Sequence, residues 1–167
     1  MRKILISVSL AVLALTIHLA LSWTHVSSAA ARASAFNDVE PWSTTQTVTP
    51  DALTKELSNA DAGKKPFVAC VGFRALYEGA HIPSSSFHGA GSTSQGIANL
   101  KKWAQNMPRS ANLVLYCGCC PLEHCPNLRP AFVALREMGF TNLRVLLLPK
   151  DFNTDWIEKG YPIEKGQ

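Results

Sequence analysis

The sequence predicts a single α/β domain in which a parallel sheet is flanked by helices on both faces. Three observations support this fold class. The chain has 167 residues, of which 47% are apolar and 17% charged, and this suits one compact hydrophobic core. Short apolar runs of strand length alternate along the chain with segments of helical periodicity. Neighbouring parallel strands need crossover connections, and helices in those connections cover both faces of the sheet.

The N-terminal segment 1–35 has the order of an export signal. Two basic residues precede an uncharged run, 4–21, and a segment rich in small residues, 27–35, follows. We expect cleavage at the end of this segment, with Ala30 and Ala31 as alternative sites. The run is also long enough for an uncleaved membrane anchor. Either interpretation places the rest of the chain in an oxidising, extracytoplasmic compartment, periplasmic or extracellular.

The charge balance argues against nucleic-acid binding. Without the expected signal segment, 13 basic residues face 12 acidic ones, and no block of Lys and Arg is present. A chain with so little excess positive charge lacks the electrostatic footprint of a nucleic-acid-binding protein. We therefore expect no nucleic-acid partner, and a membrane partner only if the signal segment is uncleaved.

Capping and turn residues predict the first elements after this segment. A polar lead-in, 36–47, precedes Thr49 and Pro50, which suit the N-cap and the first position of a helix over 52–60. The apolar run 67–71 then has the length of a buried strand.

The middle of the chain predicts a loop, a helix and the clearest strand. Residues 84–96 are rich in Ser, Gly and Thr and are expected to form a loop. A helix over 99–106 should follow, ended by Pro108. The four consecutive apolar residues 113–116 are expected to form a buried strand.

The last third predicts a helix, a strand and a final short helix. A helix over 129–138 has a proline in its first turn and ends at Gly139. The strand 143–148 and the helix 151–159 complete the chain. Because ligands of parallel sheets bind beyond the carboxyl ends of the strands, the loop after strand 113–116 is expected to hold the functional site.

That loop, 117–127, contains four of the five cysteines. Cys117 directly follows the buried strand, where backbone N–H groups of the loop and of the next helix would stabilise a thiolate. Because the thiolate is the attacking form, Cys117 is the candidate nucleophile. A structural disulfide of Cys117 with Cys120, or of Cys120 with Cys125, is an alternative. If the thiols instead cycle through a disulfide, Cys120 or Cys125 is the candidate resolving thiol.

Three parts of the sequence resemble the rhodanese family of sulfurtransferases. Residues 113–117 are similar to the strand that ends in the family's persulfide-forming cysteine. Residues 77–83 resemble its tyrosine and the glycine-histidine-isoleucine-proline turn that follows, with Ala80 in place of the glycine. Residues 139–145 and 156–162 are similar to its closing strand and helix.

The resemblance implies a rhodanese-like domain over 48–167 that transfers sulfane sulfur through a persulfide on Cys117, without a cofactor. Its partners would be a small sulfur donor, such as thiosulfate, a polysulfide or a persulfide, and a thiol acceptor. The sequence departs from the family where Cys70 and Gly72 replace the usual aspartate and arginine, and in its longer loop after Cys117.

Further residues around the loop are expected to contact the substrate, with the arginine attracting anionic donors: Gly118, Cys119, His124 and Arg129. Two alternatives to sulfur transfer use the same loop. One is a thiol–disulfide oxidoreductase. The other is a module that binds Zn or Cu(I) through soft ligands, chosen from Cys117, Cys119, Cys120, His124 and Cys125. Outside the loop, we expect His81 to be structural and Cys70 to pack as a small apolar side chain.

Overall fold

The computed structural model describes residues 40–58 and 65–166. The expected export signal, 1–35, lies outside the described residues. Within the described ranges, no helix is both long enough and apolar enough to cross a membrane.

The fold is built on a five-stranded parallel sheet with the strand order β1-β5-β4-β2-β3. The strands, in chain order, are β1 (Thr47–Val48), β2 (Phe67–Cys70), β3 (Ser86–Phe87), β4 (Leu113–Tyr116) and β5 (Leu143–Leu146). The central strand β4 is buried along its whole length, since it pairs with β2 on one side and β5 on the other. The continuous apolar pattern of residues 113–116 fits this position.

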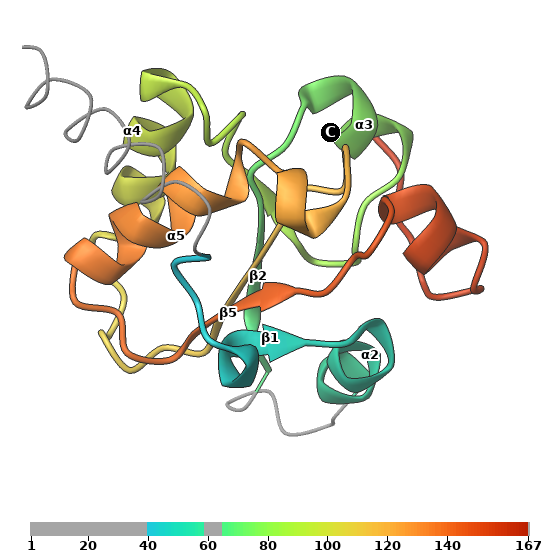
Figure 1. Cartoon of the computed structure of the whole chain (residues 1–167), viewed down its shortest axis with the longest axis horizontal. Helices are drawn as coiled ribbons and strands as arrows, with labels where there is room; N and C mark the ends of the chain where they lie inside the picture. Colours follow the sequence, from blue (N-terminus) through green and yellow to red (C-terminus); the bar gives the residue numbers. More distant parts are fainter. Residues whose placement is uncertain (1–39, 59–64, 167) are drawn as a thin grey trace, which may run out of the picture. The chain divides into compact units, whose positions relative to one another are not determined.

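Among the described residues, four α-helices and three shorter helical turns accompany the strands (Figure 1). The α-helices are α2 (Pro50–Ser58), α3 (Arg74–Gly79), α4 (Ser94–Ala104) and α5 (Leu128–Glu137). The turns are η1 (Thr44–Gln46), η3 (Leu122–His124) and η4 (Asn153–Ile157). Thr49 caps α2 as expected, because its side-chain oxygen accepts a hydrogen bond from the Ala52 N–H at 3.2 Å.

Helices cover both faces of the sheet, which confirms the predicted fold class. On one face, α4 and α5 pack side by side against alternate strand residues, with Leu100 and Phe132 fully buried. On the other face, α2, α3 and η4 enclose a second core around Leu53 and Trp156 (Figure 1). Burying two apolar layers on one sheet is the arrangement that parallel strands require.

Several elements differ from the sequence prediction. The helix α4 begins at Ser94, inside the expected loop 84–96, because the Thr93 side chain accepts a hydrogen bond from the Gly96 N–H at 3.0 Å and caps it. The strand β3 also lies inside that range, and α3 was not predicted. A two-residue strand and a six-residue helix are too short to show a periodic pattern.

The described part of the expected lead-in, from Glu40, packs against the domain. The Trp42 ring contacts Phe132 edge to face at a centroid distance of 5.4 Å. Thr47 pairs with Val145 and begins the edge strand β1. The chain before residue 48 therefore supplies both a core side chain and the first residue of the edge strand.

Candidate functional site

The carboxyl ends of β4 and β2 lie next to each other and position Cys117. Residues Cys70 and Tyr116 are register partners, so the segments that follow them leave the sheet together. A Cβ atom at Gly72 would lie 2.7 Å from the Cys117 carbonyl oxygen and 3.2 Å from its sulfur. Gly72, which stands in place of the arginine of the rhodanese pattern, thus allows the backbone to approach Cys117 closely.

Three thiols meet at this edge of the sheet. The sulfur atoms of Cys117, Cys119 and Cys125 all lie within 4.8 Å of one another. The Cys117 and Cys119 sulfurs are 3.2 Å apart. Cys117 and Cys125 are buried, whereas Cys119 is half-buried. We call these three side chains the thiol cluster.

The buried side chain of Asn127 holds the cluster in place, and sequence analysis did not identify it. Its amide nitrogen donates a hydrogen bond to the Cys117 sulfur at 3.2 Å and lies 3.8 Å from the Cys119 sulfur. Its amide oxygen accepts a hydrogen bond from the Ser92 N–H at 3.1 Å. A Cβ at Gly91 would overlap the Asn127 backbone, so the glycine makes room for it. The only feature of the sequence that could have pointed to Asn127 is its position, as a polar residue between the cysteine loop and the next helix.

The structure assigns the more acidic thiol to Cys125 and not to Cys117. The neighbouring Cys117 thiol, despite the opposing effect of burial, lowers the Cys125 pKa to about 6. Backbone N–H groups of Asn127 and Leu128 add to this effect. The pKa of Cys117 is raised, because the more acidic Cys125 lies beside it and because it is buried. The thiolate that we expected at Cys117 is therefore favoured at Cys125.

A cavity of about 450 Å³ opens beside Cys117. Its walls come from α3, the ends of β2 and β4, the start of the cysteine loop, and the segment that runs from Asp151 into η4. Apolar side chains of Leu76, Phe152 and Ile157 line much of it, and Asp151 is the acidic side chain there. None of the described residues that line the cavity is Lys, Arg or His.

The predicted site residues of the early loop lie at this cavity. Gly118 lines it with a φ of +77°, a conformation that favours glycine. A Cβ there would also lie 2.6 Å from the Cβ of Phe152. Cys119 lines the cavity as well as joining the thiol cluster.

Cys120, by contrast, is not part of the thiol cluster. Its sulfur contacts that of Cys119 at 3.2 Å, and burial with Cys119 nearby raises its pKa to about 12. As a resolving thiol, Cys120 is therefore placed less directly than Cys125.

His124 and Arg129 are placed apart from the cluster. The His124 side chain is 77% exposed and faces Glu123 at 3.8 Å. The Arg129 guanidinium donates to the Glu40 carboxylate at 2.5 Å and to the Glu123 carbonyl at 2.6 Å. In the structure these two side chains contact Glu123 and Glu40. Their expected contact with substrate stays a prediction.

Cys70 packs in the core on the opposite face of the sheet, as expected. It is 2% exposed, and burial raises its pKa to about 11. A buried thiol with a raised pKa is unreactive at neutral pH.

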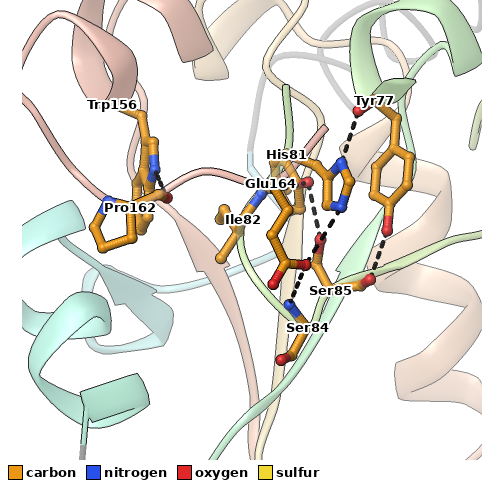
Figure 2. Close-up of polar contacts among 9 residues, drawn as sticks. Tyr77, His81, Ile82, Ser84, Ser85, Trp156, Pro162 and Glu164 are labelled. Carbon is orange, nitrogen blue, oxygen red and sulfur yellow. Dashed lines mark hydrogen bonds and ion pairs between the residues drawn. The ribbon is translucent and has the colours of Figure 1, made fainter. Parts of the chain in front are cut away.

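A second group of polar side chains surrounds the buried ring of His81 (Figure 2). The His81 Nδ1–H donates to the Tyr77 carbonyl at 2.8 Å, and its Nε2 lies 3.7 Å from a Glu164 carboxylate oxygen. The rings of His81 and Tyr77 stack at 4.0 Å. Glu164 also accepts a hydrogen bond from the Ser84 N–H at 3.2 Å, while the Tyr77 hydroxyl donates to the Ser85 carbonyl at 2.5 Å. We call this group the His81 turn. Its contacts fit the structural role that we expected for His81.

Comparison with known proteins finds similarity at the level of structure. The sequence matches no protein-family model and no curated protein. The rhodanese-like domain of the Alr3790 protein from Anabaena sp. aligns with a TM-score of 0.51 at 19% identity, over 72% of this chain and 79% of that one. The BH2092 protein from Bacillus halodurans aligns with a TM-score of 0.54 at 15% identity, over 83% and 85%.

SseA from Escherichia coli, described as a 3-mercaptopyruvate sulfotransferase with the rhodanese fold, aligns with a TM-score of 0.50 at 15% identity. The alignment covers 72% of this chain and 52% of SseA. The parallel sheet covered by helices on both faces, together with these similarities, shows that this chain has a rhodanese-like fold.

Proposed function

We propose that the protein is a sulfurtransferase that carries sulfane sulfur as a persulfide on Cys117. The observation that supports this most strongly is the position of Cys117 at the carboxyl end of the central strand, between a cavity and a second thiol. Ligands of parallel sheets bind at this edge, and a cysteine there can meet a donor inside the cavity. The expected export signal would place the reaction outside the cytoplasm.

The chemistry is a pair of displacements at sulfur. The Cys117 sulfur attacks the outer sulfur of a donor R–S–SH, the donor S–S bond breaks, and R–S⁻ leaves. As the bond forms, the Cys117 proton passes to the thiolate of Cys125, whose sulfur lies within 4.8 Å, and that proton then neutralises R–S⁻. An acceptor thiol R′–SH next attacks the outer sulfur of the Cys117 persulfide. The S–S bond to Cys117 breaks, R′–S–SH leaves, and the proton of the acceptor thiol returns Cys117 to the thiol form.

The lining of the cavity favours an organic persulfide over thiosulfate as the donor. Thiosulfate carries two negative charges, and the described lining residues offer it no cationic side chain. The carboxylate of Asp151 would repel it. Apolar walls at Leu76 and Phe152 suit the carbon skeleton of an organic donor instead.

A second candidate function, thiol–disulfide exchange, is favoured by the distance between the Cys117 and Cys125 sulfurs, which is at most 4.8 Å. Attack of Cys125 on the inner sulfur of a Cys117 persulfide would release HS⁻ and leave a Cys117–Cys125 disulfide. An external dithiol would then have to reduce this disulfide. Release of sulfide without transfer to the acceptor thiol would therefore indicate this second function.

The test measures sulfur transfer from cysteine persulfide to a small thiol acceptor, with the purified full-length chain. We expect activity in the wild type and none in Cys117→Ser. A second pair of variants tests the donor class: Leu76→Arg should raise the rate with thiosulfate, whereas the uncharged control Leu76→Gln should not. Full transfer activity in Cys117→Ser would contradict the proposal.

A further inference from the structure

The thiol cluster has the composition of a site for a soft metal ion. Three sulfur atoms within 4.8 Å of one another can contact a single ion placed between them. The Cys117 and Cys119 sulfurs, 3.2 Å apart, would separate slightly to coordinate it. Within residues 40–58 and 65–166, no other group of His, Cys, Asp and Glu side chains comes together in this way.

The surroundings of the cluster exclude hard ligands. The carboxylate of Glu123 and the imidazole of His124, the nearest such groups in the loop, are 79% and 77% exposed. The polar side chain that reaches the sulfurs is the Asn127 amide, and its nitrogen points toward Cys117 as a hydrogen-bond donor. Donors of this kind stabilise thiolate ligands without binding the metal themselves. The ligand set is therefore sulfur alone.

The number of ligands distinguishes between the soft metals. Structural zinc sites use four protein ligands in a tetrahedron. The cluster offers three, because the Cys120 sulfur, although 3.2 Å from that of Cys119, does not lie within 4.8 Å of all three cluster sulfurs. Catalytic zinc sites add a water molecule, but Cys117 and Cys125 are 3% and 0% exposed. Cu(I) is a soft, monovalent ion that thiolates bind strongly and that is stable with three sulfur ligands. We propose that Cys117, Cys119 and Cys125 form a three-coordinate Cu(I) site.

Formation of this site is an exchange of protons for the metal without a change in oxidation state. Each sulfur binds the metal as a thiolate, so every cluster thiol that is still protonated releases its proton when Cu(I) enters. The site also uses the sulfur that would carry the persulfide. Copper-loaded protein should therefore not accept sulfur on Cys117, while the metal-free protein should.

The experiment offers Cu(I) to the full-length chain without oxygen and with bicinchoninate as a competing ligand. No sulfur donor is present, so the result does not depend on whether the protein transfers sulfur. We expect one Cu(I) per chain, and an affinity at least about tenfold lower, a difference of about 1.4 kcal/mol, in Cys119→Ser and in Cys125→Ser. The control Cys70→Ala should bind as the wild type does, because Cys70 lies in the other core.

X-ray absorption of the copper-loaded wild type gives an independent test that needs no variant to fold. We expect three sulfur neighbours and no nitrogen neighbour around the copper. A nitrogen ligand, Cu(I) binding that survives loss of Cys119 and Cys125, or retention of Zn(II) in preference to Cu(I) when both are present would each overturn the proposal.

Discussion

The thiol cluster, in the loop after β4, and the His81 turn, between α3 and β3, both contain packed polar side chains, and they differ in where those polar groups point. In the His81 turn, the imidazole, hydroxyl and carboxylate are directed to backbone groups and to one another (Figure 2). In the thiol cluster, three sulfurs converge beside a cavity. Burial of polar groups alone therefore does not mark a functional site. A functional site is marked instead by reactive atoms that converge beside an accessible cavity.

The largest expected difference between the regions is in activity. Replacing Cys117 with Ser should abolish persulfide formation, because serine has no sulfur to carry it, while changing the free energy of unfolding by less than about 1 kcal/mol. Sulfur-transfer assays check the loss of persulfide formation, and urea denaturation of the same preparation checks the free energy of unfolding. A large loss of stability in this variant would mean that Cys117 is a structural residue like those of the His81 turn.

A buried histidine outside both regions, His88, is expected to make the stability of the fold depend on pH. Burial lowers the His88 pKa to about 4, and its Nε2 contacts the Ser86 hydroxyl at 2.8 Å. The unfolded chain binds this proton at a higher pH, so stability is fully present above about pH 6.5 and is lost as the pH falls toward 4. The shift corresponds to a loss of about 3 kcal/mol.

Denaturation curves from pH 7 to pH 4 should show this loss in the wild type. The variant His88→Asn, which does not titrate in this range, should show a smaller slope than the wild type. Equal slopes in the two proteins would indicate that other groups cause the acid sensitivity.

The His81 turn should respond to mutation in stability and not in chemistry. His81→Phe keeps an aromatic ring to stack on Tyr77 but leaves the Tyr77 carbonyl, in the last turns of α3, without its donor. We expect a loss of about 2 kcal/mol in the free energy of unfolding. The amount of persulfide formed per folded molecule should stay at the wild-type level. If it fell as far as in Cys117→Ser, the distinction between the two regions would not hold.

Asn127 is expected to contribute to both structure and chemistry, because its side chain is fully buried and donates a hydrogen bond to the Cys117 sulfur. Asn127→Ala removes that hydrogen bond, and persulfide formation should slow about tenfold, the effect of about 1.4 kcal/mol. The exposed amide variant Asn99→Ala serves as the matched control. Stopped-flow measurements of persulfide formation check the rate. An unchanged rate would show that the amide only fills space.

The smallest expected effect is that of His124→Ala. The imidazole is 77% exposed and faces Glu123, so its removal should change neither the rate of sulfur transfer nor the stability measurably. A clear loss of activity would restore the substrate-binding role that the sequence suggested and would require the loop to rearrange on binding.

Local patterns in the sequence carried much of the fold. The strand 113–116 was predicted with its observed bounds, because a strand buried on both faces is apolar at every position. The capping residues Thr49 and Gly139 marked the ends of α2 and α5 to within a few residues. By contrast, β3 has only two residues and depends on pairing with β2, a contact that no local pattern shows.

The same limit applies to the site. The clustered cysteines identified the loop from the sequence. The low pKa of Cys125, however, depends on backbone N–H groups at the start of α5 and on the Cys117 thiol, which the fold places beside it. The sequence suggested that Arg129 attracts an anionic donor. In the structure its guanidinium pairs with the carboxylate of Glu40, which lies 89 residues away in the sequence. Charges and donors that meet through the fold cannot be assigned from spacing alone.

The central claim is that Cys117 carries the transferred sulfur. The most direct test is the mass of the intact full-length chain, followed by peptide mapping, after exposure to cysteine persulfide. The account predicts a gain of one sulfur atom on the peptide that contains Cys117, which cyanide removes and which Cys117→Ser does not acquire. Sulfur found on another cysteine, or no gain of sulfur in the metal-free protein, would contradict it.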